Sequence, residues 1–163
     1  MRTKIFLILI SFTVTFFYAD VTAQSFSPDK VVDVKVKVNN KLSKDGLVEA
    51  VINLSILRGW HINSNKPLDN NLSPTSIKIL DNPNFKVVKI NFPPPLMKKL
   101  SFSDSQLALY EGDAPVSIEL KSLIKGPNKK IRVEGEVDYQ PCNDETCLFP
   151  VKKNFSFEIK LKK

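Results

Sequence analysis

Apolar residues recur at every second position in four segments of this chain, and mostly polar residues fill the positions between them. The segments are VVDVKVKVN (31–39), LVEAVINLSIL (47–57), KIRVEGEVDYQ (130–140) and NFSFEIKLK (154–162). A repeat of two places alternate side chains on opposite faces of an extended chain, so that one face can be buried while the other meets water. The pattern therefore predicts half-buried antiparallel β-strands.

Turn-forming sequences separate these strands from shorter ones, which we expect at 60–63, 76–80, 85–92 and 116–121. Gly46 lies between the first two strands and supplies the backbone freedom that a tight turn needs. The sequence FPPP (92–95) ends a strand, because proline cannot donate a hydrogen bond to a ladder. About eight short strands with frequent turns predict an all-β fold, specifically an immunoglobulin-like antiparallel β-sandwich.

The first 25 residues have the layout of a secretory signal peptide. Arg2 and Lys4 precede a mostly apolar run (5–18), and Val21-Thr22-Ala23 offers small residues for a cleavage site. The run is short for a membrane-spanning helix, which needs roughly 20 apolar residues. We therefore expect a cleaved signal peptide at 1–23 and a single sandwich domain at 24–163. The alternative is an uncleaved anchor.

The chain carries a net charge of +7, and residues 24–163 retain 22 basic and 16 acidic residues, a net +6. Such an excess is compatible with nucleic acid or an anionic surface as a partner. The placement of the lysines argues against nucleic acid. Lys35 and Lys37 alternate with valines, and Lys160 and Lys162 flank Leu161, as on the wet faces of strands. We expect no nucleic-acid partner and no stable membrane insertion; salt-sensitive binding to lipid or polyanions is an alternative.

The only two cysteines, Cys142 and Cys147, lie in the segment YQPCNDETCLFP (139–150). Asn143 and Asp144 favour a turn that would bring the two thiols together, and prolines bracket the segment. A bridge across about six residues would stabilise the fold by roughly 2 kcal/mol, against nearly 5 kcal/mol for a loop of about 100 residues. The residues alone leave three interpretations open: a structural disulfide, a redox-active pair or a metal site.

The metal interpretation is the weakest, because zinc needs more ligands and His61 is the only histidine. We expect neither a metal nor a cofactor. Asp144 and Glu145 lie between the cysteines and disfavour a thiolate there. A redox-active pair of this kind would be attacked by the activated thiolate of a partner rather than attack one itself.

Three segments together resemble the periplasmic N-terminal domain of the thiol:disulfide interchange protein DsbD, and in particular its stand-alone relatives, often named disulfide bond corrector proteins. These segments are GWHINSNKP (59–67), PTSIKI (74–79) and YQPCNDETCLFP (139–150). The resemblance covers about 29–162 and implies an immunoglobulin-like fold with a reversible Cys142–Cys147 disulfide. It implies protein-disulfide reductase-type exchange, with electrons passing from a membrane-embedded thiol donor to periplasmic thioredoxin-like proteins. We expect that donor to be a separate polypeptide.

The resemblance also implies a cap loop whose aromatic ring covers the disulfide. Its counterpart falls in the long irregular stretch 93–112, with Phe102 as the candidate ring. His61 and Asn63 are expected beside the cysteines on one face of a strand. Tyr139 is expected either beneath the cysteine segment or on a docking surface. The competing interpretation of the whole chain is an immunoglobulin-like binding or adhesion domain with a purely structural disulfide.

Overall fold

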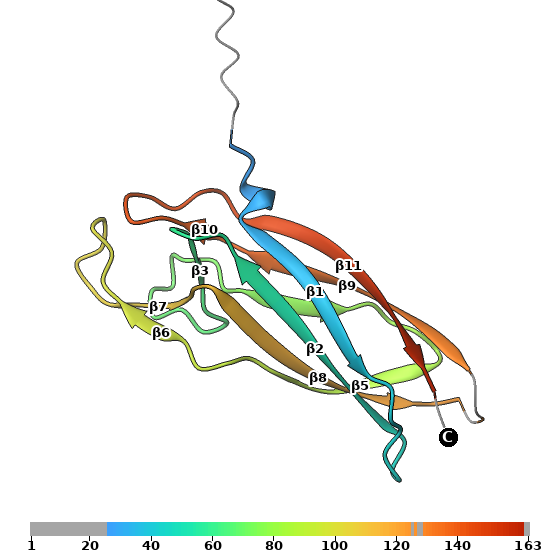
Figure 1. The fold of residues 1–163 in the computed structure, drawn as a ribbon. Coiled ribbons are helices and arrows are strands. Elements are labelled where there is room, and N and C mark those ends of the chain that lie inside the picture. Colours follow the sequence, from blue (N-terminus) through green and yellow to red (C-terminus); the bar gives the residue numbers. More distant parts are fainter. Residues whose placement is uncertain (1–25, 125, 127–128, 162–163) are drawn as a thin grey trace, which may run out of the picture.

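The computed structural model describes residues 26–124, 126 and 129–161. The proposed signal peptide at 1–23 lies outside these residues. The described chain is an all-β sandwich, as the alternating pattern predicts (Figure 1). The first sheet has the strand order β1 (Val32–Asn39), β2 (Leu47–Ile56), β8 (Asp113–Ser122) and β5 (Phe85–Asn91). The second sheet has the order β11 (Val151–Lys160), β9 (Lys130–Tyr139) and β4 (Ser76–Ile79).

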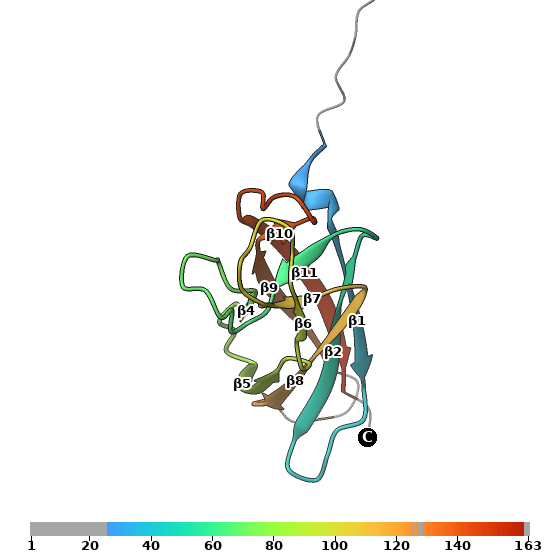
Figure 2. The same ribbon diagram turned by 90° about the vertical axis from the view of Figure 1, so that its left-hand side faces the viewer.

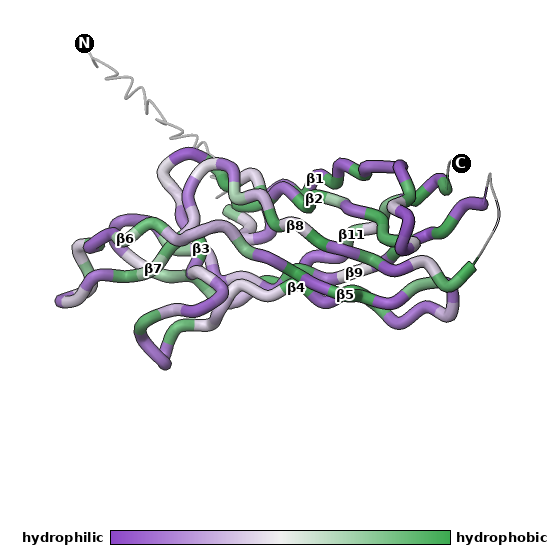
Figure 3. Tube along the Cα trace, turned by 90° about the horizontal axis from the view of Figure 1, so that it is seen from below, coloured by the Kyte–Doolittle hydropathy of each residue, from purple (hydrophilic) through white to green (hydrophobic). Residues whose placement is uncertain are grey.

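All strand pairs in these two sheets are antiparallel, and along β2, β8 and β9 most apolar residues lie on the inner face. In β2 and β9 buried residues alternate with more exposed ones along most of the strand. Figure 3 shows the same alternation as changes between green and purple along the strands. The expected turn between β1 and β2 contains Gly46, whose φ of 78° few other residues tolerate.

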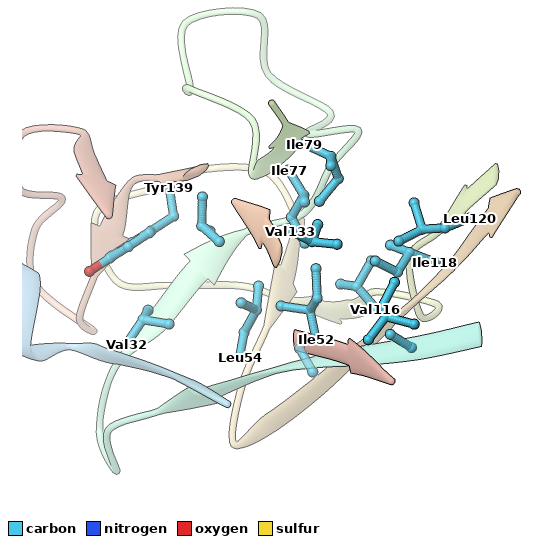
Figure 4. Close-up of a cluster of buried hydrophobic side chains, with 14 of the residues drawn as sticks. Val32, Ile52, Leu54, Ile77, Ile79, Val116, Ile118, Leu120, Val133 and Tyr139 are labelled. Carbon is cyan, nitrogen blue, oxygen red and sulfur yellow. The ribbon is translucent and has the colours of Figure 1, made fainter. Parts of the chain in front are cut away.

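The main core lies between the first and second sheets. Ile52, Leu54, Val116 and Ile118 of the first sheet meet Ile77, Ile79, Val133 and Tyr139 of the second (Figure 4). Burying a large aliphatic side chain contributes about 1.5–3 kcal/mol, so this interface supplies most of the stability of the domain.

The strand β9 contains one glycine at a buried position of its inner face. A Cβ atom at Gly135 would lie 2.5 Å from the ring of Phe155 and 2.8 Å from the backbone oxygen of Lys78. The missing side chain thus lets the ring of Phe155, directly opposite on β11, pack across β9.

A third, small sheet lies at one end of the sandwich, at the left in Figure 1. Its strand order is β10 (Pro141–Cys142), β3 (His61–Asn63), β7 (Leu107–Tyr110) and β6 (Leu96–Lys98). On one face, Ile62 and Tyr110 join the main core. Leu107, Leu109 and Cys142 instead belong to a second apolar cluster. The small sheet therefore has apolar contacts on both faces, and every residue of β7 is buried.

The stretch 93–112, expected to be irregular, contains a hairpin. Strands β6 and β7 pair with each other in antiparallel register, and β7 also pairs with β3. We call residues 96–110 the cap hairpin. Among the described residues, no helix is long and apolar enough to cross a bilayer.

Candidate functional site, a disulfide beneath a hairpin

The two cysteines form a disulfide at the edge of the small sheet. The S–S distance is 2.05 Å and the Cα atoms are 4.0 Å apart. Cys142 belongs to β10 and is fully buried, whereas Cys147 lies at the end of the cysteine loop (142–147) and is half-buried. The two cysteines therefore differ in their exposure to solvent.

Asn143 builds the turn that closes the cysteine loop. Its side-chain oxygen accepts hydrogen bonds from the backbone N–H groups of Glu145 (2.9 Å) and Thr146 (2.8 Å). Its own N–H donates to the carbonyl oxygen of Thr146 at 2.9 Å. An asparagine that bonds to the backbone two residues on is a common turn former. The loop is thus folded by its own sequence as well as by the covalent bond.

The side chain of Gln140 fastens the base of the cysteine loop to the rest of the domain. Its amide nitrogen donates to the carbonyl oxygen of Leu148 (3.1 Å). Its oxygen accepts from Nδ2 of Asn63 and from the N–H of Ser73, both at 3.0 Å. Asn63 is fully buried and also donates to the carbonyl oxygen of Ser73. Asn63 therefore acts through Gln140 to position the loop.

The cap hairpin lies against the cysteine loop, and Figure 2 shows its yellow tip beside the red loop. The backbone N–H of Ser101 donates to the carbonyl oxygen of Asp144 (3.3 Å), and the Ser101 hydroxyl donates to the same oxygen. Leu100 is buried in the second apolar cluster together with Cys142, and Cys147 packs against this cluster. The hairpin thus covers the disulfide with a leucine and is fastened beside it by a serine.

Four charged or ionisable side chains from four segments meet next to the disulfide. His61 on β3 is the register partner of Cys142 and is 2% exposed. Its Nε2 lies 3.2 Å from Oδ1 of Asp144 and 3.5 Å from Nζ of Lys98. Its Nδ1 lies 3.5 Å from Oε2 of Glu111, and Lys98 Nζ is also 3.5 Å from that oxygen. This group ties the cysteine loop to β6 of the cap hairpin through Lys98 and to the residue that follows β7, Glu111.

Nδ1 of His61 is within ion-pair distance of Glu111 but has no aligned hydrogen-bond partner among the residues that the structure describes. Glu111 is half-exposed, so its carboxylate can turn toward water while staying close to the ring. One nitrogen of a buried imidazole is therefore open to a new partner.

The other two residues proposed from the sequence lie elsewhere. Phe102 is 40% exposed, in the turn of the cap hairpin, and lines a hollow of about 600 Å³ with residues 68–71. Tyr139 is buried in the main core, and its hydroxyl donates to the carbonyl oxygens of Asp29 (3.3 Å) and Pro28 (3.5 Å). Burial, with a contribution from Asp29, raises the pKa of Tyr139 to about 12. The structure thus brings His61 and Asn63 to the cysteine segment but not the ring of Tyr139.

Sequence reasoning did not single out Leu100, Gln140, Lys98 or Glu111. Leu100 had a weak signal, since it and Phe102 are the two apolar residues of a polar segment, KKLSFSDS (98–105). Nothing local marks Gln140, Lys98 or Glu111, because their partners lie far away in the sequence. In the described part of the chain, no group of three or more His, Cys, Asp and Glu side chains is arranged to hold a metal.

Fold and site together define a class of protein: an immunoglobulin-like scaffold that presents one disulfide, beneath a hairpin, at the end of the sandwich. The chain can be placed further within this class. Residues 24–159 match the family described as thiol:disulfide interchange protein DsbD, N-terminal, and the chain belongs to this family of thiol–disulfide exchange modules.

Two solved structures have a similar fold. The DsbD n-terminal domain of Neisseria meningitidis, in the reduced form, has a TM-score of 0.53 and 18% identity, over 83% of this chain and 91% of that one. The N-terminal periplasmic domain of ScsB from Proteus mirabilis has a TM-score of 0.55 and 17% identity, over 83% of this chain and 49% of that one. The chain thus spans about half the length of the ScsB structure. No curated protein matched the chain.

Proposed function

We propose that this chain is exported to the periplasm by the segment 1–23 and there relays electrons through a reversible Cys142–Cys147 disulfide. A membrane-embedded thiol protein is the donor, and thioredoxin-like proteins are the acceptors. The single observation that carries the proposal is the asymmetric burial of the disulfide, with Cys142 enclosed and Cys147 half-exposed under a hairpin. This asymmetry leaves one cysteine within reach of a partner's thiolate while the other stays enclosed.

The burial of the two sulfurs supports an order of events. The thiolate of the donor attacks Sγ of Cys147, a bond forms between these sulfurs, and the electron pair of the broken S–S bond leaves on Sγ of Cys142. A second thiolate of the donor then attacks the donor sulfur that is bonded to Cys147. A disulfide forms within the donor, and Cys147 is released as a thiolate. The domain has gained two electrons and the donor has become a disulfide.

Electrons leave the domain by the reverse exchange. The thiolate of Cys147 attacks an oxidised thioredoxin-like acceptor, and Cys142 then attacks Cys147 to restore the intramolecular disulfide. Phe149, two residues beyond Cys147, is 89% exposed, which is unusual for a phenylalanine and suits a surface on which the acceptor docks.

Trapping with single-cysteine variants tests the proposal. The Cys142→Ala protein retains Cys147, which is activated as a mixed disulfide with thionitrobenzoate and offered to a thioredoxin whose second active-site cysteine is serine. We expect rapid release of thionitrobenzoate and a covalent complex. The Cys147→Ala protein, which retains the buried Cys142, is the matched control and should react much more slowly.

The reduction potential separates this function from an immunoglobulin-like binding domain with a structural bridge. We expect a potential above about −300 mV, since structural disulfides typically lie below that value. A lower potential, together with no transfer of electrons to or from thioredoxin-like proteins, would rule out the relay and leave the binding domain as the better description.

A further inference from the structure

We propose that His61 is the proton donor and acceptor for the sulfur of Cys142 during disulfide exchange. This inference rests on the proposed function and assigns to a buried histidine the transfer of a proton to and from the buried sulfur.

The departing sulfur of Cys142 is released at a buried position, where leucines pack against the cysteine and His61 is its cross-strand neighbour. Cys142 is fully buried, and its cluster consists of Leu100, Leu107 and Leu109, with Leu72 and Cys147 packed against it. Burial among apolar groups disfavours the charged form of a thiol, so a thiolate formed there is costly. A proton delivered as the S–S bond breaks removes this cost.

His61 is the titratable side chain adjacent to Cys142 in the sheet. In the antiparallel pairing of β3 with β10, His61 and Cys142 are direct register partners. Side chains of such partners lie on the same face, with Cβ atoms about 4.5–5.5 Å apart. His61 is the only histidine in the chain, and histidine is the side chain that ordinarily changes charge near neutral pH.

The groups around His61 hold the ring in place and connect it to solvent. Asp144 of the cysteine loop faces Nε2, Glu111 after β7 faces Nδ1, and Lys98 of β6 approaches Nε2. The side chain of Asp144 is 73% exposed and that of Glu111 is 43% exposed, whereas His61 is nearly enclosed. Protons can therefore reach the ring through either carboxylate while the ring itself stays dry.

Reduction of the disulfide conserves bonds, electrons and protons. The partner thiolate forms a bond to Sγ of Cys147, the S–S bond breaks, and its electron pair goes to Sγ of Cys142. The imidazolium of His61 gives its proton to that sulfur and becomes neutral, and Asp144 or Glu111 passes it a new proton from water. On reoxidation, His61 takes the proton from the Cys142 thiol as its sulfur attacks Cys147.

The wild-type protein gives the first test, with dithiothreitol as the reductant. The rate of disulfide reduction, divided by the thiolate fraction of dithiothreitol, should fall with rising pH through a single ionisation. The midpoint should coincide with the titration of the single histidine, followed by NMR of its ring protons. Midpoints that differ would overturn the proposal without any mutation.

The variant His61→Gln gives the second test and keeps a polar side chain at the site. At pH values below the wild-type midpoint we expect its thiolate-corrected rate to be lower by at least about tenfold, with little change across the range in which the wild type varies. Ser101→Ala is the matched control. It loosens the cap hairpin and should raise the rate at every pH while leaving the pH profile unchanged.

The outcomes distinguish this inference from the relay itself. If His61→Gln reacts with the wild-type rate and pH profile, His61 transfers no proton, although the relay can still hold. If thioredoxin-like proteins exchange with neither variant nor wild type, the relay fails. If His61→Gln does not fold, His61→Asn and the wild-type comparison of midpoints decide the matter.

Discussion

At the scale of single residues, Tyr139 illustrates how one position can satisfy two patterns. It precedes Cys142 by three residues, which suggested a place in the site, and it also ends the alternating apolar face of β9. The alternation decided its position, because a side chain on that face points between the sheets (Figure 4). Its hydroxyl then fastens the 3-10 turn η1 (Pro28–Lys30) to the core.

The raised pKa of Tyr139 predicts a loss of stability at alkaline pH. Burial raises the pKa from 10.0 in the unfolded chain to about 12 in the folded one, so the folded state holds its proton more tightly. This contribution is complete below pH 10 and is lost as the pH rises through about 12. Urea unfolding from pH 9 to 12 should show a shallower decline for Tyr139→Phe than for the wild type.

The same variant should lose about 1 kcal/mol at neutral pH, the usual contribution of a hydrogen bond. Tyr110, whose pKa burial also raises, is present in both proteins and does not affect the comparison. Identical alkaline profiles for the two proteins would show that Tyr139 ionises without cost to the fold.

At the scale of elements, the sequence predicted the long strands well and the cap hairpin poorly. Long strands of the two large sheets, such as β2 and β9, have one wet face, so their alternation is visible. Strand β7 is buried on both faces, and its sequence, LALY, is an uninterrupted apolar run without alternation. Strand β6 is too short, with only three residues, to show any pattern. The stretch therefore resembled a loop.

The register of the hairpin also decided which side chain covers the disulfide. Leu100 is buried beside Cys142, whereas Phe102 is 40% exposed at the tip. Sequence reasoning proposed Phe102 alone, although both are apolar residues of one polar segment. Which of the two is buried depends on the pairing of β6 with β7 and on the bonds from Ser101 to Asp144, and neither is visible in the sequence.

We expect Leu100→Ala to open the disulfide to small thiols. Removing this buried side chain should cost about 2–5 kcal/mol of local or global stability. The rate of reduction by dithiothreitol should rise several-fold at constant pH, because the cover over the sulfurs is lost. Phe102→Ala is the matched control and should leave the rate near that of the wild type. The reverse result would identify Phe102 as the covering residue.

At the scale of the whole molecule, the sequence predicted the fold class and identified the two cysteines as the candidate site. It did not predict which side chains surround the cysteines. The alternation predicts strands, and Asn143 and Asp144 favour a turn that brings Cys142 and Cys147 together. The neighbours of that turn come from pairings across long separations, such as His61 with Cys142 and Ser101 with Asp144. Such pairings arise only when the small sheet closes the end of the sandwich.

The disulfide cluster and the main core are separate in the structure. Cys142 and Leu100 belong to the small cluster at one end, whereas β2, β8 and β9 supply the core between the large sheets. A relay needs this separation, because its disulfide must break in every cycle without unfolding the scaffold. The loop closed by the bridge is also short, so its loss frees little chain entropy.

We therefore expect the double variant Cys142→Ala, Cys147→Ala to remain folded. Its free energy of unfolding should fall by about 2 kcal/mol, the entropy of a loop of about six residues. In hydrogen exchange, the amides of β2 and β8 should keep their protection, and faster exchange should be confined to the cysteine loop and the cap hairpin. The wild-type protein, chemically reduced, should give the same pattern. Loss of protection throughout the large sheets would mean that the bridge holds the fold together, and a domain that depends on its bridge in this way could not serve as a carrier of electrons.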